Sequence, residues 1–298
     1  MNNKQLYIIG NGFDIFHGVN SRYSDFKNYV EDNDNKLFEA LDEYFNSDEL
    51  WSEFEDTLAY IDTDKIVDDA SNYLVSYNVE DWSEAYHHDY QYEVQRAIDV
   101  ITITLRKLFT TWILSLEIPS SGQLKLPTSS TYLTFNYTNT LEKAYKIFSS
   151  NIIYIHNKAF DEKSTLILGH SRQPTPENSF DNKADWEDVD VRVAEGNRIL
   201  DNYFENTYKN TDAIINENRA FFNHLNSIDE VFVLGHSISP VDIKYFREVK
   251  ENVQANSTWT VSYYTDEQND KLKNSLIEIG IDSSKIKMIK LIELLIKN

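Results

Sequence analysis

The strongest indication of the fold is the stretch Leu6-Tyr7-Ile8-Ile9-Gly10-Asn11-Gly12-Phe13-Asp14. A short apolar run that ends in closely spaced glycines is typical of a buried parallel strand followed by a tight turn. Five of the eight glycines follow apolar runs in this way: Gly10, Gly12, Gly18, Gly169 and Gly235. In an open parallel sheet, ligands bind outside the carboxyl ends of the strands, where backbone must approach them closely. The sequence therefore predicts an α/β, Rossmann-like fold, with an open, mainly parallel sheet and helices on both faces.

Along the rest of the chain, short apolar or β-branched runs predict further strands. They cover residues 131–135, 152–155, 166–168, 230–234 and 258–264. Helical spacing predicts one long helix over 83–116 and others over 198–225 and 267–279, while the proline- and aspartate-rich segment 172–191 is expected to be a surface loop or lid. We expect one domain over residues 1–298, with a helical insertion at about 35–120 after the first βα unit and a loop and helix insertion at about 172–226.

The composition excludes several classes of protein. The chain has 298 residues, a net charge of −21 and no cysteine. The lack of cysteine excludes a disulfide framework, a thiolate zinc site and a cysteine nucleophile. The acidic excess disfavours nucleic acid as a partner, because a phosphate backbone needs cationic side chains. No apolar run approaches the roughly 20 residues that span a bilayer, and no secretory signal is visible, so we expect a cytoplasmic protein without a membrane partner.

The first candidate site is the turn after the first strand. Its candidates for binding a nucleotide are Gly10, Asn11, Gly12, Phe13, Asp14 and His17. Successive backbone N–H groups in such a turn can bind a phosphate, and Asp14 can accept a hydrogen bond from a ribose hydroxyl or simply cap the next turn. A G-x-G pattern alone fits a purely structural turn equally well, because the third glycine of the dinucleotide fingerprint is missing.

Polar residues also follow the other predicted strands. Asn136 and His156 are the catalytic candidates: Asn136 can orient a water or a ribose, and His156 is either a catalytic base or a structural histidine. Further candidates for nucleotide binding are Tyr137, Thr138, Gly235, His236, Ser237 and Asp242. Thr138 can instead cap the helix that follows it. Because carboxyl ends of parallel strands lie at one edge of a sheet, we expect these side chains to share one crevice.

Three histidines raise the alternative of a metal site. His156, His170 and His236 are all predicted to follow strand ends. They lie on different strands and form no i, i+4 or H-x-H pair, which is the spacing that metal-binding histidines commonly show. We therefore expect no bound metal.

In this order, the blocks resemble the AbiH family of bacterial abortive-infection proteins. The resemblance is carried by Gly10-Asn11-Gly12-Phe13-Asp14 with His17-Gly18 and Tyr23-Ser24-Asp25-Phe26, by Phe135-Asn136-Tyr137, and by Gly235-His236-Ser237 with Asp242. It spans nearly the whole chain. It implies a role in antiviral defence, in which infected cells are arrested.

The same blocks are similar, more distantly, to those of sirtuin-type NAD-binding domains. The matching positions are Gly10, Gly12 and Gly18, then Thr134, Asn136 and Tyr137, then His156, and finally Gly235-His236-Ser237-Ile238 with Asp242, whereas Asn11, Asp14, Thr138 and Asn157 depart from the pattern. The resemblance implies NAD as substrate or ligand, cleaved at the nicotinamide–ribose bond with Asn136 orienting ribose or water and His156 acting as the base. Without cysteines the zinc module of deacetylating sirtuins is missing, which favours nucleotide cleavage over protein deacetylation.

Two other functions stay open. A nucleotide-binding sensor would bind the same small-molecule nucleotide without turnover, and a metal-dependent nuclease would need a basic groove and a carboxylate cluster, neither of which is visible. The sequence is compatible with a homo-oligomer. It identifies neither the true nucleotide, whether NAD, NADP or ATP, nor the phage trigger.

Overall fold

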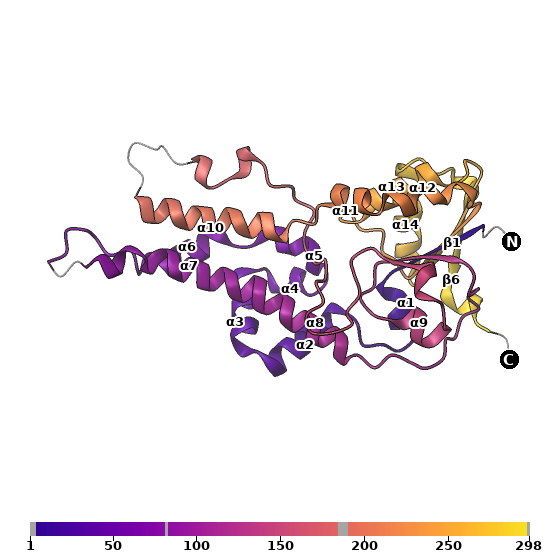
Figure 1. The fold of residues 1–298 in the computed structure, drawn as a ribbon, viewed down its shortest axis with the longest axis horizontal. Helices are drawn as coiled ribbons and strands as arrows, with labels where there is room; N and C mark the ends of the chain where they lie inside the picture. Colours follow the sequence, from indigo (N-terminus) through magenta and orange to yellow (C-terminus); the bar gives the residue numbers. More distant parts are fainter. Residues whose placement is uncertain (1–3, 81–82, 184–189, 297–298) are drawn as a thin grey trace. The chain divides into compact units, whose positions relative to one another are not determined.

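The computed structural model describes residues 4–80, 83–183 and 190–296. The chain forms two compact units and passes from the first into the second twice (Figure 1). Unit 1 contains the described residues within 1–22, 110–167 and 210–298, and unit 2 contains those within 23–109 and 168–209. The insertions expected at about 35–120 and 172–226 each overlap unit 2 and extend beyond it. Whether the two units form one domain stays a prediction.

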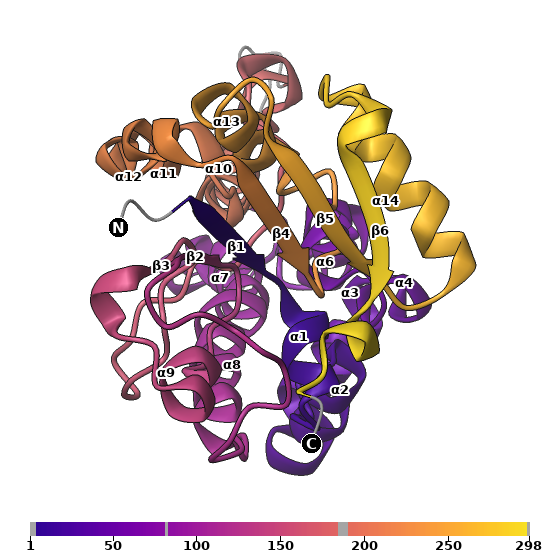
Figure 2. The ribbon, with the colours of Figure 1, turned by 90° about the vertical axis from the view of Figure 1, so that its right-hand side faces the viewer.

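Unit 1 is built on a six-stranded sheet. Its strands are β1 (Gln5–Ile9), β2 (Thr131–Thr134), β3 (Ile152–Tyr154), β4 (Glu230–Leu234), β5 (Thr258–Tyr263) and β6 (Ile286–Lys290). They lie in the order β3-β2-β1-β4-β5-β6, and every pair is parallel; Figure 2 shows β1, β4, β5 and β6 side by side. In this doubly wound order the winding reverses between β1 and β4, and ligands of such folds bind at that switch point. The Rossmann-like fold predicted from the sequence is confirmed.

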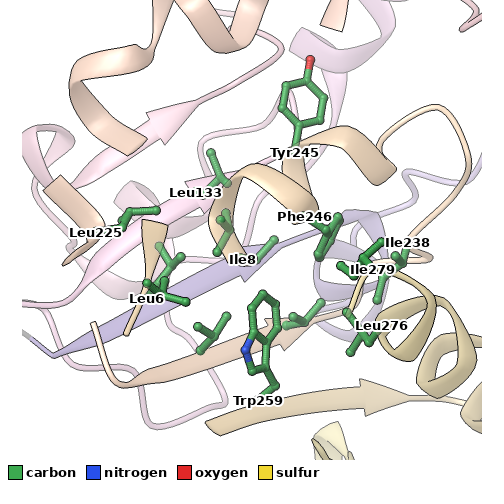
Figure 3. Packing of buried hydrophobic residues seen from close by; sticks show 14 of the residues in the cluster. Leu6, Ile8, Leu133, Leu225, Ile238, Tyr245, Phe246, Trp259, Leu276 and Ile279 are labelled. Carbon is green, nitrogen blue, oxygen red and sulfur yellow. The ribbon is translucent and has the colours of Figure 1, made fainter. Parts of the chain in front are cut away.

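Alternate residues of the strands pack on opposite faces of the sheet. Leu6 and Ile8 belong to one core cluster, which also contains Trp259 (Figure 3), whereas Tyr7 and Ile9 belong to the other. The first face is covered by α11 (Thr211–Glu217), α12 (Arg219–Asn223), α13 (Ile243–Asn252) and α14 (Asp266–Glu278), the second by α1 (Asn11–Phe16) and α9 (Thr140–Tyr145). Because both faces of the sheet are buried at β1, the sequence of this strand from Leu6 to Ile9 is a continuous apolar run.

Unit 2 is helical. Its helices are α2 (Tyr23–Asn33), α3 (Asn35–Tyr44), α4 (Ser47–Leu50), α5 (Phe54–Thr57), α6 (Thr63–Ser71), α7 (Asp89–Asp99) and α10 (Val191–Thr207). The helix α7 continues through the π-helical turn Val100–Thr104 into α8 (Leu105–Ser115). The helix α7 lies beside α10 (Figure 1). Phe26 packs edge-on against both Phe54 and Phe109, at ring-centroid distances of 5.8 and 5.2 Å. None of the helices within the described residues combines the length and the apolar character needed to cross a bilayer.

Two of the predicted elements are wrong. Residues 166–168 form no strand: the run contains the passage from unit 1, which includes Ile167, to unit 2, which begins again at Leu168. The helix predicted over 198–225 is three helices, because Tyr208 leaves the helix to form a bridge with His170 and the Asn210 side chain then caps α11. Within the segment 172–191, residues 172–183 carry only the short turns Pro176–Asn178 and Asp181–Lys183, and 184–189 lie outside the described residues.

Candidate functional site

The loops after β1 and β4 contact each other closely. The Gly10 N–H donates to Leu234 O over 3.0 Å, and the Gly12 N–H donates to Gly235 O over 2.7 Å. A Cβ on Gly10 would lie 2.6 Å from the Cα of His236, so no larger residue fits there without movement. The Phe13 N–H donates to Gly10 O. Three of the amides expected to face a phosphate, those of Gly10, Gly12 and Phe13, are therefore bonded within the protein, and the glycines allow the two loops to pack together.

Asn11 and His17 are also engaged within unit 1. The Asn11 side chain donates to Ser21 O and accepts from the Ser21 hydroxyl. His17 Nδ1 lies 2.7 Å from Phe13 O, and its Nε2 lies 2.5 Å from the Tyr145 hydroxyl. Burial lowers the pKa of His17. These two side chains therefore hold α1 to the loop after it and to α9.

Asp14, Asn136 and Thr138 form a buried polar group at the ends of β1 and β2, which we call the Asp14 cluster. The Thr138 hydroxyl donates to Asp14 Oδ2 over 2.5 Å. Asp14 is 1% exposed, and this burial raises the pKa of its carboxyl, an effect that the neighbouring polar side chains of Thr138, Thr140 and Asn136 oppose. Among the described residues, Asp14 Oδ1 and both polar atoms of the Asn136 side chain have no hydrogen-bond partner.

His156, Asp242 and His236 form a second group, which we call the His–Asp–His cluster. His156 Nε2 lies 3.7 Å from Asp242 Oδ1, and His236 Nε2 lies 3.7 Å from Asp242 Oδ2. The Ile238 N–H donates to His236 Nδ1 over 2.9 Å. A nitrogen that accepts a hydrogen bond carries no proton, so His236 Nε2 carries it and directs it toward Asp242.

Aromatic rings hold the two imidazoles. The ring of Phe135 meets those of His156 and His236 edge-on, at centroid distances of 5.2 and 4.3 Å. Tyr245 and Phe246, both on α13 (Figure 3), contact His156 at 5.6 Å and His236 at 5.0 Å respectively. Tyr245 is a site residue that was not predicted from the sequence. Its position three residues after Asp242, on the same face of a helix, is the signal that could have found it.

The structure places the two catalytic candidates in different clusters. The rings of Phe135 and Tyr137 both contact His156, whereas Asn136, between them, neighbours Asp14. Alternate residues of extended backbone point to opposite sides, which explains the division. Ser237 lies in the loop between β4 and α13 and is exposed.

The third histidine is elsewhere. His170 belongs to unit 2, where its Nε2 lies 3.1 Å from the Thr207 hydroxyl oxygen. The prediction that it follows a strand end is wrong, because residues 166–168 form no strand. Across residues 4–80, 83–183 and 190–296, no group of three or more His, Asp or Glu side chains has an arrangement that could hold a metal ion.

Comparison with known proteins identifies the family. A search of curated proteins finds no match. The family model described as Bacteriophage abortive infection AbiH matches residues 6–263, a range that includes β1 except its first residue, β2 to β5 and both polar clusters. Because this match covers most of the chain, the protein belongs to the AbiH family of bacteriophage abortive infection proteins.

Proposed function

We propose that this protein binds a nucleotide at the carboxyl ends of β1 to β4 and hydrolyses NAD at the nicotinamide–ribose bond. Membership of the AbiH family points to a role in phage abortive infection, and loss of NAD is a direct way to arrest an infected cell. The resemblance of the strand-end blocks to those of sirtuin-type domains supports the same substrate. The binding roles of the remaining candidates, from Gly10 to Ser237, stay predictions.

The side chain of Asn136 carries the proposal. Its amide is buried, and neither its oxygen nor its nitrogen makes a hydrogen bond of good geometry among the described residues, although the amide lies close enough to the Asp14 carboxyl to lower the pKa of that carboxyl. A buried polar group left unpaired costs about 1–3 kcal/mol, so such groups usually serve a ligand or an ordered water. Asp14 Oδ1 is a second such atom in the same cluster. Two acceptor oxygens and one amide donor match the hydroxyl groups of a ribose.

His156 supplies the second part of the proposed chemistry. It follows β3, the neighbour of β2 in the sheet, and neighbouring strands lie about 4.8 Å apart. A ribose with its hydroxyls is large enough to reach side chains at the ends of both strands. We propose that one ribose reaches both Asn136 and His156 although the two side chains belong to different clusters.

The reaction balances with water as the only co-reactant. The bond between C1′ and the pyridinium nitrogen breaks, and its electron pair leaves with neutral nicotinamide. Water forms a new bond to C1′ and gives up one proton, which His156 accepts, so that the products are ADP-ribose, nicotinamide and a proton. Asn136 orients the water or the ribose, which is the main requirement of an oxocarbenium-like transition state.

The test incubates the purified full chain with NAD, NADP or ATP and resolves the products by mass spectrometry. We expect nicotinamide and ADP-ribose from NAD, and a rate at least about 100-fold lower in Asn136→Ala and in His156→Ala, the usual loss for a general base. Asn139→Ala is the matched control, because Asn139 is an exposed amide of the same loop and makes no capping bond.

The same variants are compared in phage-infected cells by their NAD content. Equal NAD loss in all of them, with equal turnover in vitro, would exclude the assigned residues. Binding of NAD in a calorimeter, with no product in either setting, would instead identify a nucleotide-binding sensor.

A further inference from the structure

We infer that Asp242 is a positioning residue that joins His156 and His236 into one unit, in which two imidazoles share a single carboxylate. The consequence for turnover rests on the proposed function, because it requires His156 to act as the base. The sharing itself is a property of the protein without nucleotide.

The geometry allows Asp242 to serve both histidines at once. Each imidazole Nε2 faces a different carboxylate oxygen, at 3.7 Å in both cases. The Asp242 backbone is held on both sides, since its N–H donates to Ser239 O and its carbonyl accepts from the Tyr245 N–H, each over 3.0 Å. The carboxylate therefore lies between two rings whose own positions are set by aromatic packing.

The backbone of Ile238 supports the assignment of His236. Ile238 has a φ of +50°, in the left-handed region that costs a residue with a β-branched side chain about 1–3 kcal/mol. In this conformation its N–H donates to His236 Nδ1. The donation fixes the tautomer of the imidazole, so that the proton on Nε2 is directed at Asp242. Strain of this kind persists where the surrounding structure requires one geometry.

Burial makes the coupling between the histidines strong. The side chains of His156, His236 and Asp242 are 2%, 4% and 13% exposed, so water screens their charges little. With both imidazoles neutral, each already carries one ring proton and Asp242 gives the cluster a charge of about −1. One added proton makes the cluster neutral, whereas a second added proton leaves a net positive charge among aromatic rings. The two histidines are therefore expected to titrate in coupled steps.

The ring contacts of these imidazoles are with phenols and phenyl groups. The phenols of Tyr137, after β2, and Tyr245, on α13, contact His156. Phe135 and Phe246 contact His236. Asp242 is the carboxylate that both histidines face, and through it the protonation of one histidine affects the other.

The test is a pH titration of the imidazole resonances by NMR, in the full chain without nucleotide. We expect wild-type His156 and His236 to titrate in two coupled steps. Asp242→Asn, which keeps the size of the side chain, should lower the pKa of both histidines by about 1 unit or more, because an opposite charge at this distance shifts a pKa by about 1–3 units. Asp212→Asn is the control, since Asp212 is exposed and pairs with Lys244 at the surface.

A second variant removes one histidine and keeps the loop intact. In His236→Asn the amide oxygen can replace Nδ1 as the acceptor for the Ile238 N–H, while the group that faces Asp242 is lost. His156 should then titrate in a single step, with a higher pKa than in the wild type because it no longer shares the carboxylate. Thermal melting confirms that each variant is folded.

The outcomes separate this inference from the proposed function. Unchanged histidine titrations in Asp242→Asn overturn the inference even if NAD is hydrolysed. Coupled titrations without turnover overturn the hydrolase and leave the shared carboxylate standing. If both hold, the acidic limb of the pH profile of kcat should move with the pKa of His156 in Asp242→Asn, an effect that loss of packing alone does not produce.

Discussion

Asp14 shows how a single buried carboxyl links the site to stability. One of its oxygens accepts from Thr138, and the other has no partner among the described residues. Burial disfavours the charged form, so the pKa of Asp14 in the folded protein lies above its value of 3.8 in the unfolded chain. The stabilising contribution of this group is complete below the unfolded pKa and is lost as the pH rises through the folded pKa.

Replacing Asp14 by Asn removes this pH dependence while keeping an oxygen that accepts from Thr138. The free energy of unfolding of Asp14→Asn, relative to wild type, should therefore increase between pH 3.5 and pH 7. The increase is about 1.4 kcal/mol for each pH unit by which the folded pKa exceeds the unfolded one. Urea unfolding at the two pH values measures it, with the exposed Asp270→Asn as the control. If the difference in free energy of unfolding between Asp14→Asn and wild type is unchanged or smaller at pH 7, burial does not raise the pKa of Asp14.

At the scale of residues, the sequence predicted which positions lie at strand ends but not how they are grouped. Asn136 and His156 both follow strands, as predicted. Because side chains alternate in direction after β2, Asn136 lies beside Asp14, whereas Phe135 contacts His156. The amide of Gly12 was expected to face a phosphate and instead donates to Gly235. That partner is more than 200 positions away along the chain, and no local pattern indicates it.

At the scale of elements, the contact between the loops after β1 and β4 depends on Gly235. Its φ is +67°, and a Cβ would lie 2.1 Å from the backbone nitrogen of Phe13, which cannot move without displacing α1. Gly18 has a similar φ of +78° but nothing within 4 Å of its Cβ position. Adding a Cβ at Gly18 therefore costs only the strain of the backbone conformation, whereas adding one at Gly235 also creates a steric clash.

We expect Gly18→Ala to lower the free energy of unfolding by about 1 kcal/mol, the cost of the left-handed conformation for a residue with a side chain. Gly235→Ala should lower it by at least about 2 kcal/mol more, because overpacking against backbone adds to the same conformational cost. Urea denaturation followed by circular dichroism provides both values. Equal losses in the two variants would mean that the loops can separate freely, and the close contact would then have no energetic role.

Most of the strands could be predicted from the sequence. Four of the five further strands predicted begin and end within one residue of β2, β3, β4 and β5, because buried parallel strands are continuous apolar runs bounded by polar residues. The errors arose where tertiary contacts override local preference. The helix predicted over 198–225 contains no proline or glycine to stop it, and it ends at Thr207 because Tyr208 bridges to His170.

At the scale of the whole molecule, the two units carry buried titratable groups of different kinds. His170 is fully buried in unit 2, and the Thr207 hydroxyl, whose proton goes to Tyr203 O, accepts from its Nε2. Burial and the charge of Arg172 lower the pKa of His170 to about 4. Unit 1 contains Asp14, whose raised pKa makes its contribution to stability decrease as the pH rises, the opposite of His170. It also contains His17, whose pKa is lowered by burial. Acid should therefore affect the two units differently.

The unfolded chain binds a proton at His170 near pH 6.5, but the folded one does not until about pH 4, so the stability that this group contributes is present above pH 6.5 and is lost as the pH falls. At pH 5 the loss amounts to about 2 kcal/mol, or about 30-fold in the population of opened molecules. After correction for intrinsic exchange rates, amide hydrogen exchange in α10 should accelerate by that factor between pH 7 and pH 5.

The control variant is His170→Gln, whose Nε2 can still donate to Thr207 and whose side chain does not titrate. It should remove the acceleration in α10 while leaving the pH response of β1 and β4 as in the wild type, because those strands belong to unit 1. If α10 exchanges equally fast in the variant at pH 5, the acid sensitivity of unit 2 has another origin than the buried imidazole.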